Sequence, residues 1–260
     1  TGTVKRLTIG ENSKIVSNDS MVGSIAGVCN SGTIEDCANY GSVTTSFIHC
    51  GGIAGWIRNS STIKRCVNGG NVEGKQMPGG ILSYIETVDS SQNIVTQCYN
   101  LGKVTATESM AGGICPVNNN EKNKTTSTVF SDCYNAGIIE SPNGVYPVIR
   151  FASCPNSYFD ITVMPSGSFN GSSGAKGLTT VQMQSWALAY ALNGQSMNGA
   201  WTYNPDGYPG FGTLTRPEDW SAIGQGVVDE LITAGALTTG DGLADSPYQI
   251  ESAVQLAAFA

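Results

Sequence analysis

A seven-residue signature, Cys-x-Asn-x-Gly-x-Val, recurs within the first 140 residues and constrains the fold more than any other feature. Its four clear copies begin at Cys37, Cys66, Cys98 and Cys133, the last with Ile in place of Val. A large apolar residue stands three positions before each cysteine: Ile34, Ile63, Val95 and Phe130. Self-similarity at a period of about 20–50 residues indicates one structural unit stacked on itself.

A degraded fifth copy follows the four. We place it at Cys154 and Asn156, with Phe151 in the apolar position and Tyr158 in place of the glycine. The array of units is therefore expected to end near residue 160.

A glycine-rich step precedes each signature, as in Gly51-Gly52-Ile53. The spacing from each cysteine to the next such step stays at 14–15 residues, whereas the spacing from the step to its own cysteine grows from 13 to 20. One side of the unit is thus fixed and the other absorbs insertions. This is typical of a solenoid whose variable loops project from one face.

The units are predicted to be strands rather than helices. Apolar residues alternate with period two around Ile53 and Ile57, and so many glycines and asparagines would destabilise helix interiors, which disfavours a helical solenoid. Each Asn-x-Gly is expected to supply the positive φ that a sharp corner needs. We predict an all-β fold: a parallel β-helix (β-solenoid) of about four to five coils over residues 1–160, with equivalent residues stacked in ladders.

The unit Gly-Gly-Ile-Ala-Gly…Thr-Ile-x-x-Cys-x-Asn-x-Gly-x-Val resembles the GLUG repeat of bacterial cell-surface proteins, over roughly residues 21–160. This resemblance implies a β-helix-like solenoid in a large, repeat-built protein that is secreted or attached to the cell wall. It implies no catalytic residues. The chain departs from the pattern at Ser83 and Pro116, which replace the last glycine of the step in the third and fourth units.

The composition argues against several classes of partner. Thirteen Lys and Arg against 20 Asp and Glu give a net charge of −7, which disfavours nucleic acid and anionic membranes. No run approaches the roughly 18 apolar residues of a membrane span, so no membrane insertion is expected. The chain opens at Thr1 without a signal peptide and stops at Ala260 inside an apolar run. We therefore expect a fragment of a larger, exported multidomain protein.

Five of the eight cysteines fall at the repeated position: Cys37, Cys66, Cys98, Cys133 and Cys154. We expect an inward-facing ladder of small, unreactive thiols rather than a disulfide framework, because stacked Cβ vectors run parallel. Three others occupy different repeat positions: Cys29, Cys50 and Cys115. No metal or cofactor is expected, since the chain has no Cys-x-x-Cys pair and His49 is its only histidine.

Residues 161–215 are predicted to form a small C-terminal cap with one helix. After a loop over 161–177, the helix is expected to run from Thr179 to Asn193, with a capping box of Thr179 and Gln182 at its start. Gly194 is expected to end it. A solenoid needs such a cap because its last coil otherwise exposes core and an unpaired edge.

Residues 216–260 leave two alternatives open. They resemble the entry segment of a further repeat array, and they could instead cap the first coil. Within them, Asp241 and Asp245 in a glycine-rich loop are candidates for Ca²⁺, although a structural turn is the preferred interpretation because two carboxylates alone are a weak signal.

No catalytic constellation is visible in the sequence. His49 is interpreted as a solvated or hydrogen-bonded residue at a coil corner rather than as a general base. Glu35, Asp36 and Asp132 are the carboxylates that adjacent coils could bring together for glycoside cleavage. Ordinary surface polarity is the preferred interpretation, because these carboxylates do not recur in every unit.

Two features are candidates for ligand binding. Trp56 and Tyr84 occupy equivalent positions on adjacent coils; facing outward they would form a platform for sugar rings, and facing inward they would be core, which Val28 and Val117 in the same register favour. The second candidate is the polar segment from Val117 to Thr128, which includes Asn118, Asn119 and Asn120. Loops on rigid scaffolds often carry recognition, and an insertion without a ligand is the alternative.

The sequence thus favours a non-catalytic, adhesin-like repeat protein, secreted or at the bacterial cell surface. It would bind an extracellular ligand such as a host glycan, a host or matrix protein, or a cell-wall component. Two alternatives stay open: a carbohydrate-active β-helix enzyme, either a polysaccharide lyase or a hydrolase, and a structural stalk with no ligand.

Overall fold

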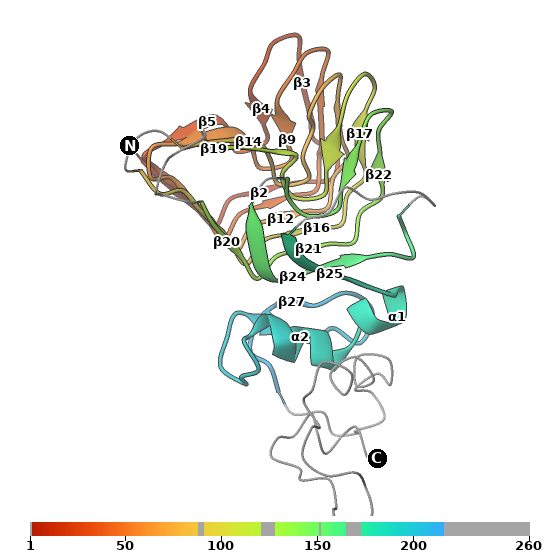
Figure 1. The fold of residues 1–260 in the computed structure, drawn as a ribbon. Coiled ribbons are helices and arrows are strands. Elements are labelled where there is room, and N and C mark those ends of the chain that lie inside the picture. The colour runs from red at the N-terminus through yellow and green to blue at the C-terminus, as the bar shows by residue number, and fades with distance from the viewer. Residues whose placement is uncertain (1, 88–90, 121–127, 151, 165–172, 216–260) are drawn as a thin grey trace, which may run out of the picture. The chain divides into compact units, whose positions relative to one another are not determined.

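The computed structural model describes residues 2–87, 91–120, 128–150, 152–164 and 173–215. The chain divides into two compact units, Thr1–Gly177 and Leu178–Ala260. The first unit is a β-solenoid of about four turns, shown in Figure 1. The predicted all-β solenoid is therefore confirmed. The first unit of the chain extends to Gly177, beyond the boundary that the sequence predicted at residue 160.

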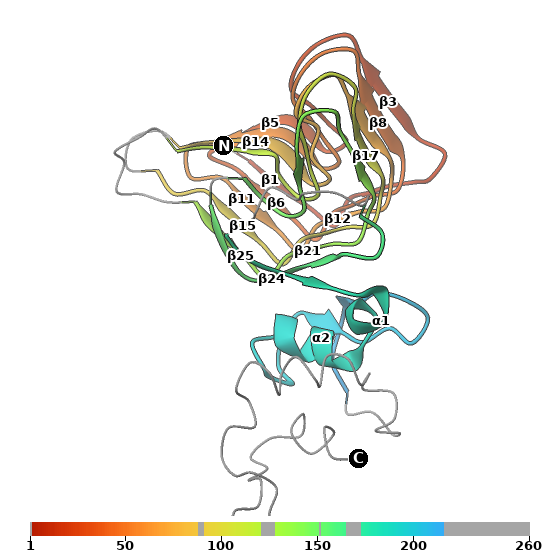
Figure 2. The same cartoon turned by 45° about the vertical axis from the view of Figure 1, so that its right-hand side comes forward.

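One coil consists of five short strands joined by tight turns. They are β6 (Thr33–Glu35), β7 (Ala38–Asn39), β8 (Ser42–Thr45), β9 (Cys50–Gly51) and β10 (Ala54–Arg58). The next coil repeats the same path, so that Ile34 pairs with Ile63 and Val43 with Val72, both in parallel register. In Figure 2 the equivalent strands β3, β8 and β17 lie one behind another.

Equivalent strands stack into five rows. The row containing β6 also has β1 (Thr3–Lys5), β11 (Thr62–Lys64), β15 (Ile94–Thr96) and β20 (Val129–Ser131). The row of β7 has β2 (Thr8–Ile9), β12 (Val67–Asn68), β16 (Tyr99–Asn100), β21 (Tyr134–Asn135), β24 (Ser153–Asp160) and β25 (Ser173–Leu178).

The row of β8 has β3 (Lys14–Ser17), β13 (Val72–Gly74), β17 (Val104–Ala106) and β22 (Ile139–Glu140). The row of β9 has β4 (Val22–Gly23), β18 (Ala111–Gly112) and β23 (Val145–Tyr146), with Gly79 bridging Gly51 to Gly112. The row of β10 has β5 (Ala26–Asn30), β14 (Leu82–Thr87) and β19 (Val117–Asn120). Because β25 continues the row of β7, the loop predicted over 161–177 is wrong at its C-terminal end.

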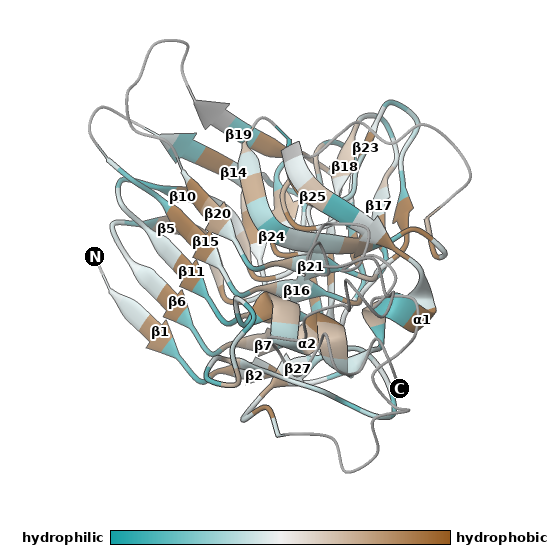
Figure 3. Ribbon diagram, turned by 60° about the horizontal axis from the view of Figure 1, so that its bottom comes forward, coloured by the Kyte–Doolittle hydropathy of each residue, from teal (hydrophilic) through white to brown (hydrophobic). Residues whose placement is uncertain are grey.

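The predicted ladders form the core of the first unit. The residues of the apolar column and of the cysteine column are buried and belong to one cluster: Ile34, Ile63, Val95, Phe130, Cys37, Cys66, Cys98 and Cys133. The apolar residue at the centre of each of β1, β6 and β11 is visible as a brown row in Figure 3. All eight cysteines are buried, free thiols.

The asparagines of the signature form a second interior ladder. The Nδ2 of Asn68 donates to Oδ1 of Asn100 at 2.7 Å and to the carbonyl of Gly70 at 2.8 Å, and the same pattern repeats at the neighbouring coils. A Cβ on Gly70 would lie 1.8 Å from the carbonyl oxygen of Gly41. The glycine is thus required because successive coils approach closely.

The expectation that Asn-x-Gly supplies positive φ is wrong. The left-handed residues are instead those directly before the ladder cysteines: Asp36, Arg65, Gln97 and Asp132, with φ between 49° and 56°. They make the corner between the row of β6 and the row of β7. Asparagine and aspartate tolerate this region better than arginine or glutamine, so side-chain type alone does not identify the corner.

The fifth unit has a different register from the one read in the sequence. Tyr134 pairs with Tyr158, so Ser157 rather than Cys154 follows Cys133 in the cysteine column. The Oγ of Ser157 accepts from the Cys133 amide at 3.2 Å. One coil earlier, the sulfur of Cys133 accepts from the Cys98 amide in the same way. Cys154 falls in the column of Phe130 and is still buried in the core cluster. Its membership in the predicted cysteine ladder is therefore wrong, although its burial is right.

A coil without the signature precedes the first cysteine. Val4 pairs with Ile34 and Ile9 with Asn39, so Ile9 stands at the start of the asparagine ladder. Ile9 has no side-chain donor, and Oδ1 of Asn39 is buried with no hydrogen-bond partner in the described structure. The solenoid thus begins before the recurring residues do.

The second unit is described from Leu178 to Thr215. It contains α1 (Thr180–Met183), α2 (Trp186–Leu192), β26 (Trp201–Thr202) and β27 (Gly210–Phe211). The predicted capping box at Thr179 is present, but the single helix is wrong. The Oγ of Ser185 accepts from the Leu188 amide at 3.2 Å and donates to the Gln182 carbonyl at 2.7 Å, which starts a second helix. The capping role of residues 161–215 stays a prediction, and 216–260 lie outside the described residues.

Candidate ligand-binding site

Trp56 and Tyr84 lie side by side on the outer face of the row of β10. Their neighbours Ile57 and Ile85 are fully buried in the core, so the alternation of the strand directs the two rings to the opposite side. The ring centroids are 5.1 Å apart at an interplanar angle of 75°. The predicted adjacency is therefore correct, but the rings pack edge to face, and the interpretation as core is wrong because both are only half-buried.

His49 completes a three-ring cluster with them. It has a φ of 60° at the turn that leads into β9, and its ring centroid lies 4.8 Å from that of Tyr84 and 6.2 Å from that of Trp56. In Figure 1 the chain changes direction between β4 and β5, the equivalents of β9 and β10 in the preceding coil. We call His49, Trp56, Arg58 and Tyr84 the aromatic corner.

The hydrogen bonds of His49 determine its tautomer. The hydroxyl of Ser83 donates its one hydrogen to the carbonyl of Met77 at 2.5 Å. The Nδ1 of His49, 3.1 Å from the same hydroxyl oxygen, must therefore carry a hydrogen and donate it. Burial lowers the pKa of His49, so the ring is neutral at neutral pH and Nε2 is an acceptor. The predicted hydrogen-bonded histidine at a coil corner is confirmed.

Arg58 lies over the indole of Trp56, with its guanidinium carbon 5.6 Å from the ring centroid. Its Nη1 is 3.8 Å from Glu86, a long ion pair on a side chain that is 40% exposed. Two donors here, Nε1 of Trp56 and Nε of Arg58, are buried and have no hydrogen-bond partner among the described residues. Buried donors normally have partners, so these two are available to an acceptor from outside the chain, either water or a ligand.

The second predicted feature is the polar segment from Val117 to Thr128. Its described residues do not form a recognition loop. Asn118, Asn119 and Asn120 belong to β19, which pairs with β14. Asn118 is buried, and its Oδ1 accepts from the Thr128 hydroxyl at 3.2 Å. Its exposure was predicted from polarity, which cannot distinguish an interior asparagine from a solvated one. The remainder of the segment, 121–127, lies outside the described residues.

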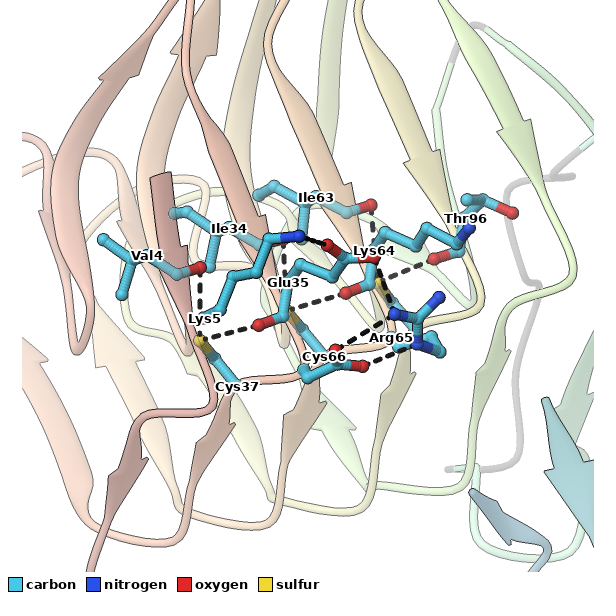
Figure 4. A network of polar contacts seen from close by, with 12 residues as sticks. Val4, Lys5, Ile34, Glu35, Cys37, Ile63, Lys64, Arg65, Cys66 and Thr96 are labelled. Atoms are coloured by element: carbon cyan, nitrogen blue, oxygen red, sulfur yellow. Dashed lines mark hydrogen bonds and ion pairs between the residues drawn. The ribbon is translucent and has the colours of Figure 1, made fainter. Parts of the chain in front are cut away.

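The candidate carboxylates are held in polar networks instead of facing each other across a cleavage site. Glu35 accepts from Lys5 and Arg65, and Asp36 accepts from Arg65, as Figure 4 shows for the Lys5, Glu35 and Arg65 groups. The hydrogen bond from Lys5 and then that from Arg65 lower the pKa of Glu35, and the hydrogen bond from Arg65 lowers the pKa of Asp36. Asp132 accepts from Ser131 and Asn156, both at 2.7 Å. These groups fasten neighbouring coils together.

The thiols offer no reactive centre. Burial raises the pKa of Cys98 and of Cys115 well above the ordinary value, and it raises that of Cys154 to about 11. A buried thiol with a raised pKa is a poor nucleophile. Across the described ranges no group of three or more His, Cys, Asp or Glu is placed to hold a metal ion. Asp241 and Asp245, the calcium candidates, lie outside those ranges.

Comparison with known proteins finds no match: no family model, no curated protein and no solved structure matches this chain. The resemblance to the GLUG repeat therefore stays an expectation from the sequence. In the described part of the chain, no helix is long and apolar enough to cross a membrane. The site must be interpreted from its own chemistry.

Proposed function

We propose that this chain is a non-catalytic, adhesin-like repeat protein, secreted or displayed on a bacterial cell surface, that binds a glycan at the aromatic corner. The observation that carries the proposal is the pair of unpartnered donors beside the rings of Trp56 and Tyr84. The solenoid would space and present this site within a larger multidomain protein.

A sugar ring matches the corner in two ways. It has an apolar face of C–H groups that packs on aromatic rings, and a rim of hydroxyls that each donate and accept hydrogen bonds. The corner offers donors at Trp56 and Arg58 and an acceptor at Nε2 of His49. Apolar surface with a few directed polar groups is the usual composition of a small-ligand site.

Arg58 would act as a cover over Nε1 of Trp56. Both Nε1 of Trp56 and Nε of Arg58 are shielded from water. A swing of the guanidinium off the indole would break only the cation–π contact and the 3.8 Å ion pair with Glu86. Such partly exposed contacts contribute about 1 kcal/mol or less, so a ligand hydroxyl that accepts from Nε1 of Trp56 can displace the guanidinium, and the swing also exposes Nε of Arg58.

The enzyme alternative has less support. Cleavage of a glycosidic bond normally needs two carboxyl groups on opposite sides of the bond. Glu86 is the carboxylate that contacts the corner, and Glu35, Asp36 and Asp132 are engaged elsewhere in the networks of the coils. A pure stalk would leave the buried donors of the corner unexplained.

A glycan array with the 260-residue chain tests the proposal, with Trp56→Ala as the disabling variant and Phe47→Ala as the matched control. Phe47 is a large aromatic side chain that is 51% exposed and lies outside the corner. We expect binding by the wild type and by Phe47→Ala, and a loss of more than about tenfold in affinity for Trp56→Ala.

Three results would contradict the proposal. Depolymerisation of a bound polysaccharide would show an enzyme. Binding to host proteins or peptides, with no glycan bound, would show a protein-recognition site. No binding to either kind of array would favour the stalk.

A further inference from the structure

The aromatic corner belongs to two rows of side chains that continue over four coils. The first row holds Met21, His49 and Met110, which directly precede β4, β9 and β18, and Met77 at the equivalent turn of the coil between β9 and β18. Backbone hydrogen bonds join these turns between successive coils, and Met21, His49 and Met77 share a left-handed φ of 55–62°. The second row is fixed by strand register: Val28, Trp56, Tyr84 and Val117.

The two rows face each other along the bend. His49 contacts the rings of Trp56 and Tyr84. A Cβ added to Gly27 would lie 2.6 Å from the carbonyl oxygen of Met21, so backbone from the two sides meets at the base of the bend. In the neighbouring coils, methionine occupies the equivalent positions of the first row and valine those of the second. Methionine adapts its shape readily to an apolar surface.

The rows end at the fifth coil. Tyr146 stands where the preceding coil has Gly112, and the guanidinium of Arg150 lies 5.2 Å above its ring. The Nη1 of Arg150 also contacts Met110 sulfur at 2.8 Å. These bulky groups close one end of the rows. At the other end, Val28 is 41% exposed.

Resting on the proposed function, we infer that the ligand is a linear chain of pyranose sugars lying parallel to the solenoid axis along these rows. Parallel strands are about 4.8 Å apart, a distance close to the length of one ring in an extended chain, so four coils offer roughly three successive ring positions. The site therefore recognises a run of about three rings, whereas a single sugar would use only Trp56 and Tyr84.

The test is calorimetric titration of the 260-residue chain with size-graded linear oligosaccharides, of one to six rings, built from glucose, mannose, galactose, N-acetylglucosamine or galacturonic acid. In the series that binds, affinity should rise about two- to tenfold with each ring, then become constant beyond three or four rings. Two variants separate the ends of the rows. Met110→Ala should weaken binding of the tetramer several-fold and leave a monomer unchanged, whereas Val28→Trp should strengthen the tetramer selectively.

Val28→Trp changes an exposed side chain, so it keeps the test valid if Met110→Ala fails to fold. Equal affinity for monomer and tetramer, lost in Trp56→Ala, would overturn the extended-chain inference and leave the proposed glycan binding intact. Absence of binding in every series would overturn the inference, and absence of binding on the glycan array as well would overturn both.

Discussion

The interior of the solenoid and its aromatic corner are built on the same coils but treat repetition in opposite ways. Inside, the same residue recurs over four successive coils in the asparagine ladder, where each Nδ2 donates to the next Oδ1 at 2.7 Å. At the corner, His49, Trp56 and Tyr84 interrupt rows otherwise made of methionine and valine, and two donors have no partner within the described structure. Repetition thus encodes stability, and departure from it marks the candidate function.

Breaking the asparagine ladder should give the largest loss of stability. Asn68→Leu removes donors to Gly70 and Asn100 and the acceptor of Asn39. Leaving these buried groups unpaired should lower the free energy of unfolding by about 2–4 kcal/mol, measured by urea denaturation. Asn18→Leu is the matched control: the exposed Asn18 accepts a hydrogen bond from the hydroxyl of Ser46, and its loss should stay within about 0.5 kcal/mol. Equal losses in both variants would show that the ladder stabilises the fold no more than an exposed hydrogen bond does.

The interior thiols should make the protein sensitive to alkali. An unfolded thiol has a pKa near about 8.5, whereas burial raises the pKa of Cys50 to about 12 and that of Cys154 to about 11. The folded state therefore keeps protons that the unfolded state loses. Stability is full below about pH 8.5 and falls as pH rises toward 11–12, by about 1.4 kcal/mol per pH unit for each such thiol.

Urea denaturation at pH 8, 9 and 10 measures this slope. Cys50→Ala should reduce it by the share of one thiol, and Cys154→Ala should do the same over a narrower pH range. If the slope is unchanged in both variants, other groups cause the alkaline loss.

At the aromatic corner, we expect a small effect of mutation on stability and a large effect on ligand binding. Trp56→Ala removes a half-buried ring outside the core, so we expect it to lower the free energy of unfolding by only about 1–2 kcal/mol while ligand binding is lost. Thermal denaturation and the glycan array together measure the two effects. A loss of stability as large as that of Asn68→Leu would show that the corner is structural.

The smallest effect on the free energy of unfolding should come from the titration of His49 at acid pH. Burial lowers its pKa, so the unfolded chain takes up a proton near about pH 6.5 while the folded chain resists it. The contribution of His49 to stability is thus full above that pH and is lost as the pH falls toward its folded pKa. In His49→Gln, the free energy of unfolding should fall less steeply between pH 7 and pH 5, as measured by urea denaturation. An identical acid slope in the variant would exclude this titration.

The amount that the sequence predicted differs between the two regions. Burial of Ile34, Ile63 and the ladder cysteines follows from recurrence, because a position that must face the core tolerates few side chains. The register of the fifth unit did not follow, since Ser157 replaces cysteine there and Cys154 fits the apolar column. The coil at Val4 and Ile9 was not recognised as a repeat because it lacks the signature altogether.

By itself, the sequence determined the architecture of the first unit: a parallel solenoid with apolar and cysteine ladders, because period and residue type repeat together. It also determined that Trp56 and Tyr84 are neighbours. Only the tertiary structure decided which way these rings face, because Ala54 and Ile57 are both buried, and their burial decides the face only once the strand is placed against the core. It alone brought His49 and Arg58 to the same rings. Contacts between separate rows of strands depend on how each coil folds back, which no spacing along the chain specifies.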